Sequence, residues 1–181
     1  HLDWPPPSPK EVISRLRQGD VLTHCFRPFP AAPARSDGRI RDEILEARER
    51  GIIFDIGHGV GSFGFETAET MLDAGFLPDA ISSDVHSLSI KGPAYDQLVT
   101  LSKFLHLGMS ISDIIAASTT GPARAIRRPE LGTLSPGSIG DATILNIDDG
   151  KFIFTDSLGH TRTGDKKFTL KGIVLDGEIW N

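Results

Sequence analysis

Three segments of the sequence repeat one layout, in which a short apolar run follows a glycine or a tight turn and ends in acid–base side chains. The runs cover residues 21–24, 52–58 and 80–86, and they lead to His24, His58 and Asp84. Short apolar runs of this kind are typical of parallel strands that are buried on both faces. In a parallel β/α barrel, side chains at the C-terminal ends of the strands point into the active site. The layout therefore predicts an α/β protein of enzyme type, with these three side chains at one end of the sheet.

Helix signals alternate with these runs, as a parallel sheet requires. Ser8-Pro9-Lys10-Glu11 has the residues of a capping box and predicts a helix start. Further amphipathic segments follow at residues 39–50, 65–75 and 95–108. From residue 131 the pattern changes to glycine-punctuated β-like runs at residues 142–147, 151–155 and 172–175. We therefore predict two parts, a β/α part over residues 1–130 and a small β part over residues 131–181.

Composition limits the classes of protein that fit. With 39% hydrophobic and 24% charged residues, the 181-residue chain is typical of a soluble globular protein. No apolar run approaches the ~20 residues of a membrane span, so no membrane partner is expected. A net charge of -5 argues against nucleic acid as a partner. A single cysteine, Cys25, excludes an intrachain disulfide framework and suggests a cytoplasmic protein.

The strand-end residues suit metal or proton chemistry. Imidazole nitrogens and carboxylate oxygens are ligands of Zn²⁺ and related divalent ions, and a carboxylate beside them can act as a general base. A histidine at one strand end is most simply a hydrogen-bonded structural residue, but three such ends in series favour a site. The glycines around His58 allow close approach of the backbone to a ligand, and His86 is placed to line the mouth of the site. Cys25 lies within an apolar run and is interpreted as a core residue.

Several motifs together resemble a known family. Val21-Leu-Thr-His24-Cys-Phe, Phe54-Asp-Ile-Gly-His58-Gly and Ile81-Ser-Ser-Asp84-Val-His86 resemble strands six, seven and eight of the amidohydrolase superfamily, with the closest likeness to its dihydroorotase-like deacetylase branch. Ser118-Thr-Thr-Gly121-Pro-Ala-Arg124 and the glycine-rich segment 131–142 resemble the link that returns such chains to their small β-domain. The resemblance implies the C-terminal half of a (β/α)₈ barrel, strands five to eight, plus part of a small β-sandwich domain.

The resemblance also assigns roles. It implies that His24 and His1, the strand-six and strand-five histidines, are metal ligands, and that Asp84 is both a metal ligand and the general base. His58, Gly59 and His86 fall at positions near the substrate. The family's strand-one His-x-His pair and strand-four lysine have no counterpart here, so a missing N-terminal half is expected from the same gene product or from a second chain.

The expected function is hydrolysis of an amide or ester, either an acetyl group or a cyclic amide of a small-molecule substrate, with one or two divalent ions, Zn²⁺ first among them. Two other classes stay open: a non-catalytic fragment or one chain of a split barrel, and a barrel relative that binds a ligand without turning it over. Assembly as a homo-oligomer also stays open.

Overall fold

The computed structural model describes residues 1–2 and 6–180. The N-terminal part contains three short parallel strand segments. β1 (Val21–Leu22) pairs with β2 (Ile53–Phe54) in parallel, with Val21 opposite Ile53. A parallel bridge between Asp55 and Ala80 adds the third segment next to β2. The backbone bonds His58 N→Ser82 O and Gly59 N→Ser83 O, at 3.1 and 3.0 Å, continue this pairing beyond the bridge. The prediction that the three runs lie parallel and adjacent in chain order is confirmed.

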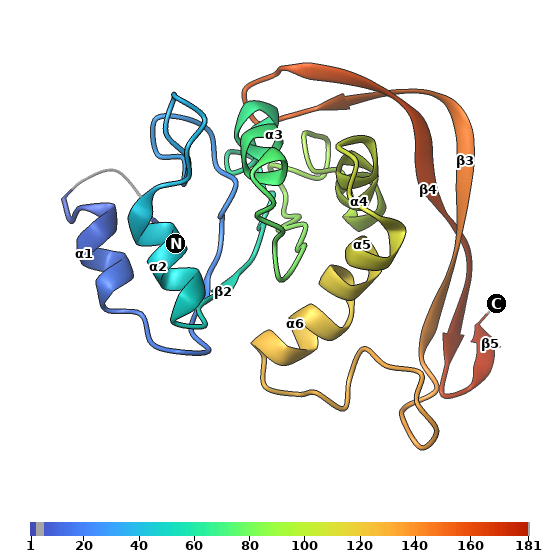
Figure 1. Ribbon diagram of the computed structural model, residues 1–181. Coiled ribbons are helices and arrows are strands. Elements are labelled where there is room, and N and C mark those ends of the chain that lie inside the picture. Colours follow the sequence, from blue (N-terminus) through green and yellow to red (C-terminus); the bar gives the residue numbers. More distant parts are fainter. Residues whose placement is uncertain (3–5, 181) are drawn as a thin grey trace.

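The part of the chain that the structure describes has six helices: α1 (Pro9–Ser14), α2 (Asp42–Glu49), α3 (Phe65–Asp73), α4 (Gln97–His106), α5 (Ile111–Ser118) and α6 (Thr120–Ala125) (Figure 1). The first four lie where the sequence predicts helices, and α2 and α3 connect the parallel segments. The starts follow from capping chemistry: Ser8 and Glu11 form both bonds of a capping box, and the Asp96 and Ser110 side chains accept from the backbone of α4 and α5. Within the described residues, none of the helices has the length and apolar character needed to cross a membrane.

The C-terminal part forms an antiparallel sheet of β3 (Ala142–Thr155), β4 (Thr161–Leu175) and β5 (Glu178–Trp180), in that order. The predicted β-like runs do lie in strands, but the predicted strand limits were wrong. The structure joins the runs 142–147 and 151–155 into one strand, because pairing with β4 resumes after an irregularity between Asp149 and Phe152. Such a bulge absorbs an extra residue without ending the strand.

The β3–β4 hairpin packs along the helices and shares their core. Figure 1 shows it running along α4 and α5, with its turn over α3. Phe154 and Phe168, which are 3% and 2% exposed, belong to the same hydrophobic cluster as Phe26, Phe63 and Phe104 of the β/α part. The hairpin therefore stabilises the β/α part through this shared core. The division at residue 130 stays a prediction.

The hairpin turn also supplies a helix cap that the local sequence lacks. Gly64 begins α3 without a capping side chain. Asp156, in the turn between β3 and β4, accepts the Phe65 amide at 3.0 Å. A carboxylate at this point satisfies an unpaired N–H group and interacts favourably with the helix dipole. A residue 91 positions away in the sequence thus fixes the start of α3.

Candidate metal-binding and acid–base site

The loops that follow the three parallel segments carry the predicted residues, and two of these residues have unusual backbone geometry. His24 follows β1 with φ of +60°, and Asp84 follows the third segment with φ of +46°. Residues other than glycine rarely adopt this left-handed region. Such strain costs on the order of 1–3 kcal/mol and clusters at functional sites. Both residues invoked for metal and proton chemistry are therefore held in conformations that local preference alone would not select.

The His24 ring is oriented by a backbone carbonyl. Its Nδ1 lies 2.7 Å from the Gly57 carbonyl oxygen, which can only accept, so Nδ1 is the donor and Nε2 is the nitrogen that has the lone pair in the neutral ring. The His1 ring lies beside it, with 5.2 Å between ring centroids. A histidine whose second nitrogen donates to a carbonyl is the usual arrangement of a metal ligand. These two neighbouring imidazoles fit the chemistry of a Zn²⁺-type ion.

Two glycines of the loop after β2 make room for the side chains of the site. Gly57 and Gly59 have φ of +49° and +52°. A Cβ at Gly57 would lie 2.4 Å from Thr23 Oγ1 and 2.7 Å from His24 Nδ1, and a Cβ at Gly59 would lie 2.5 Å from Asp84 Oδ2. The Gly59 position was expected to approach a substrate. In the structure its open face is filled by the Asp84 carboxylate, so we interpret Gly59 as a spacer for that carboxylate.

Asp55, whose role the sequence did not predict, forms hydrogen bonds that connect the ends of all three parallel segments. Its Oδ2 accepts from Thr23 Oγ1 at 2.6 Å and from Ser82 Oγ at 2.8 Å, and its Oδ1 accepts from the Ser82 amide at 3.2 Å. Ser82 Oγ in turn accepts the Gly57 amide at 3.1 Å. Thr23 precedes His24 directly, and Ser82 lies two residues before Asp84. The sequence signal that could have identified Asp55 is a carboxylate inside an apolar run. The contacts with the Thr23 and Ser82 hydroxyls become visible only in the structure.

His58 is placed differently from the other predicted residues. The side chain is fully buried, and its ring stacks on Phe63 with 4.7 Å between centroids. Nδ1 lies 2.9 Å from the Gly59 carbonyl oxygen and Nε2 lies 2.6 Å from Lys103 Nζ. Burial, followed by the Lys103 charge, lowers the pKa of His58 to about 3. Both ring nitrogens are occupied by partners within the chain, and the substrate contact of His58 stays a prediction.

His86 and Cys25 complete the set of predicted residues. His86 is exposed, and its Nδ1 accepts the Leu88 amide at 3.3 Å, so it stays a predicted substrate contact. Cys25 is 3% exposed, which confirms it as a core residue. Burial, together with the Asp55 charge, raises the pKa of its thiol well above the ordinary value. A thiolate nucleophile is therefore disfavoured at this position.

The donor set of the described residues fits a divalent ion in kind. Among residues 1–2 and 6–180, no group of three or more His, Cys, Asp or Glu side chains is arranged to hold a metal ion. The His1 and His24 imidazoles form the paired part of the set, and Asp84 lies across the neighbouring loop against Gly59.

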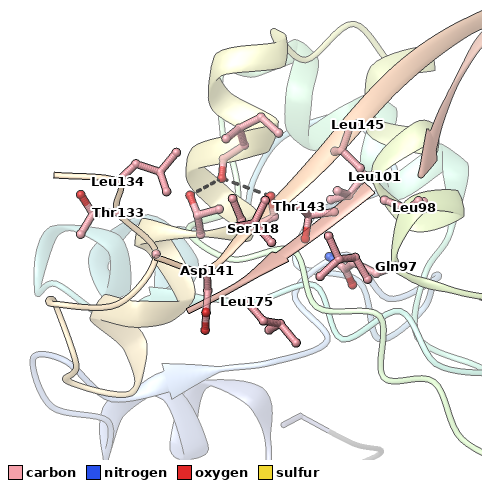
Figure 2. A pocket seen from close by; sticks show the side chains of 16 residues that line it. Gln97, Leu98, Leu101, Ser118, Thr133, Leu134, Asp141, Thr143, Leu145 and Leu175 are labelled. Atoms are coloured by element: carbon pink, nitrogen blue, oxygen red, sulfur yellow. Dashed lines mark hydrogen bonds between the residues drawn. The ribbon is translucent and has the colours of Figure 1, made fainter. Parts of the chain in front are cut away.

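A pocket of about 430 Å³ lies elsewhere, between α4, α5 and the hairpin. Figure 2 shows its lining, which is mainly apolar and includes Leu98, Leu101 and Leu145 together with the polar residues Ser118 and Asp141. None of the predicted site residues lines it. Because the chemistry-bearing side chains sit at the strand ends, we place the candidate site there and not in this pocket.

Parallel strands joined by helices, with histidine and aspartate on the loops that follow them, define a β/α architecture with polar strand-end residues. Residues 42–180 match the model of the amidohydrolase family. The chain belongs to this family. The match covers the second and third parallel segments, all helices after α1, and the whole hairpin.

Known proteins are similar along the entire chain. A protein named deacetylase from Enterococcus faecalis is 33% identical over 183 residues, which is 100% of this chain and 50% of the relative. A deacetylase from Brucella anthropi is 34% identical over 98% of this chain and 44% of the relative. Crystal structures described as an adenine deaminase and a dihydroorotase superpose with TM-scores of 0.95 and 0.87, each at 33% identity. They are covered over 50% and 49% of their length by 100% and 99% of this chain, which thus spans about half the length of its relatives.

Proposed function

We propose that the protein containing this chain is a metal-dependent hydrolase that opens a C–N bond or an ester, either an acetyl group or a cyclic amide. The observation that carries this proposal is the geometry at the strand ends, where the loop after β2 contacts the His24 ring of the His1–His24 pair at Gly57 and the Asp84 carboxylate at Gly59. The names of the relatives, deacetylase and dihydroorotase, support the substrate class. One of the similar structures is described as an adenine deaminase, a name that also refers to a C–N bond. The experiment must therefore decide which substrate carries this bond, an acetylated compound or a cyclic amide.

The residues take separate roles in this proposal. His1 and His24 hold the divalent ion, Zn²⁺ being the first choice, with His24 Nε2 as the available donor. When bound, such an ion polarises a carbonyl oxygen and acidifies water. Asp84 accepts a proton from the attacking water at a carboxylate oxygen and returns it to the leaving nitrogen or oxygen. His86, exposed beside Asp84, contacts the substrate.

We also propose that further parallel strands complete the sheet, so that the described segments correspond to strands six, seven and eight of a (β/α)₈ barrel. Within the described residues, β1 pairs only with β2, and Val21 is 40% exposed. Parallel sheets are normally covered and continued on both sides. The same strands would supply the missing ligands, whether they come from the same polypeptide or from a second chain.

The test of the reaction uses the complete protein with Zn²⁺ or Mn²⁺ and measures acetate release from N- and O-acetyl substrates and opening of cyclic amides. Asp84→Asn should lower kcat by roughly 10²–10⁴ and retain metal, because the amide keeps its shape but takes no proton. His24→Ala should lose metal. Asp73→Asn, an exposed carboxylate at the end of α3, is the matched control. Near wild-type kcat in Asp84→Asn would contradict the assignment of the base.

The test of the completed sheet uses the 181-residue chain by itself. It should bind metal weakly and show no turnover, and both should return when the complementary strands are supplied. A folded monomer of this chain with stoichiometric metal and turnover would contradict the half-barrel proposal. Stoichiometric metal without turnover in the complete protein would instead favour a ligand-binding relative.

A further inference from the structure

Lys103, on α4, has a fully buried side chain and three acceptors for its three N–H groups. Its Nζ lies 2.6 Å from His58 Nε2, 2.8 Å from the Pro93 carbonyl oxygen and 2.7 Å from the Thr155 carbonyl oxygen. Since His58 Nδ1 donates to the Gly59 carbonyl, Nε2 must accept from Lys103. Burial lowers the pKa of Lys103 to about 7, and Asp156 opposes this shift. A buried lysine is costly, so its complete satisfaction here calls for an explanation.

The three acceptors come from three separate parts of the chain. His58 lies in the loop after β2, Pro93 lies in the loop that follows Asp84, and Thr155 is the last residue of β3. One ammonium group therefore joins both loops of the candidate site to the hairpin. The hairpin turn is itself fixed to α3 by the bond between Asp156 and the Phe65 amide.

His58 connects Lys103 to the residues that contact the candidate metal ligand and base. The residue before it, Gly57, accepts the His24 ring N–H, and the residue after it, Gly59, lies against the Asp84 carboxylate. The His58 ring is fixed at Nε2 by Lys103 and at Nδ1 by the carbonyl of Gly59. Loss of the Lys103 bond would free the ring and with it the Gly59 carbonyl that the ring holds.

We propose that Lys103 is a positioning residue for the candidate site, acting through His58 to hold residues 57–59 and thereby the His24 ring and the Asp84 carboxylate. This inference rests on the proposed function. The competing explanation is that Lys103 only stabilises the fold. Replacing it by methionine leaves three buried acceptors unsatisfied, each at a cost of about 1–3 kcal/mol, so a loss of stability is expected in either case. The test therefore needs measurements that a loss of stability alone would not change.

The first measurement is amide hydrogen exchange in the complete protein. The His58 and Gly59 amides donate to Ser82 and Ser83, while the Ile53 and Asp55 amides, in the β1–β2 pairing, serve as internal references. In Lys103→Met, exchange at residues 58 and 59 should accelerate at least about tenfold relative to the references. Ile13→Ala, a buried α1 variant of comparable destabilisation, and the exposed Lys171→Met should leave this ratio unchanged.

The second measurement is steady-state kinetics with a double-mutant cycle. Lys103→Met should lower kcat at least about tenfold with KM nearly unchanged, because the misplaced groups act on the chemical step. His58→Phe keeps a ring against Phe63 but removes both bonds, and it should show a similar loss. Lys103→Met added to His58→Phe should then lower kcat by less than about twofold more, since both variants break one connection.

The proposal is overturned if exchange at residues 58 and 59 responds equally to Lys103→Met and Ile13→Ala, or if the two kcat losses multiply. If Lys103→Met does not fold, the unmodified protein decides: exchange at His58 and Gly59 should be as slow as at Ile53, and fast exchange there contradicts the connection. Absence of turnover in the unmodified protein contradicts the proposed function instead, and the exchange data alone then decide the role of Lys103.

Discussion

Replacing Gly59 by alanine gives a direct test of how the loop after β2 serves Asp84. The new Cβ would lie 2.5 Å from Asp84 Oδ2, about 1 Å inside ordinary contact distance. The carboxylate can turn aside, so the contact itself costs little stability, but the base leaves its position. The backbone adds a second effect, because φ at this residue is +52° and a left-handed residue with a Cβ costs roughly 1–2 kcal/mol.

Two other glycines separate these effects. Gly19 has φ of +79°, and a Cβ added there would meet no atom within 4 Å, so Gly19→Ala carries the backbone cost without the contact. Gly61 has neither a positive φ nor a neighbour within 4 Å, so Gly61→Ala controls for the substitution itself. Gly59→Ala and Gly19→Ala should both lower the free energy of unfolding by about 1–2 kcal/mol, while Gly61→Ala should be neutral or slightly stabilising.

Only Gly59→Ala should lower kcat at saturating Zn²⁺, by at least about tenfold, which corresponds to about 1.4 kcal/mol in activation free energy. The upper limit is the loss expected from removing the base altogether, roughly 10²–10⁴. Urea unfolding and acetate release on the complete protein measure the two quantities. Equal kcat values in Gly59→Ala and Gly19→Ala would refute the idea that Gly59 exists to seat Asp84.

Three further predictions concern His58, Asp55 and Asp79. The pKa of His58 is lowered from 6.5 to about 3, so the unfolded chain binds a proton below about pH 6.5 that the folded chain rejects. Its contribution to stability is present above that pH and is lost at about 1.4 kcal/mol per pH unit as pH falls, and His58→Phe should flatten the difference between urea unfolding at pH 7 and pH 5. Asp55→Asn should lower the free energy of unfolding by about 1–3 kcal/mol and should also lower kcat. The reason is that an amide nitrogen at the Oδ2 position cannot accept from the Thr23 and Ser82 hydroxyls. Unchanged kcat would show that the strand ends keep their positions without this carboxylate. Asp79 lies just before the third segment and forms ion pairs with Arg48 and Arg124 at 3.0 and 2.9 Å. The variant Asp79→Asn should lose a similar amount of stability but keep the wild-type kcat, measured by the same two assays, because Asp79 lies at the opposite end of the strand from the site.

Much of the fold could be predicted from local sequence because the signals are local. Capping residues such as Ser8 and Ser110 satisfy backbone groups within three positions, and the apolar stripes of the helices follow the 3.6-residue period. The three apolar runs predicted parallel neighbours because short crossover helices bring sequential strands together. The strand-end positions of His24 and Asp84 could be predicted for the same reason: each follows its strand segment closely, and strand ends of a parallel sheet meet at one edge.

The β3 strand shows where local signals fail. Residues 148–150 are Asp-Asp-Gly, a pattern that favours a turn, and the sequence analysis divided the strand there. The structure continues the strand because β4 pairs on both sides of the irregularity. Long-range hydrogen bonds outweigh the preference of a few residues, and they are invisible until the partner strand is in place.

Local sequence was enough to predict which strand ends carry polar side chains: a histidine, a glycine-flanked histidine and an aspartate, each at the end of an apolar strand. What each of them does depends on contacts that form only in the folded chain. Folding places His58 in the core because Lys103, 45 positions away, approaches its Nε2, and Asp55 takes its role from hydroxyls 32 and 27 positions away. The physical reason is that a polar side chain takes its function from the groups that satisfy its hydrogen bonds, and for buried groups those partners come from distant parts of the chain.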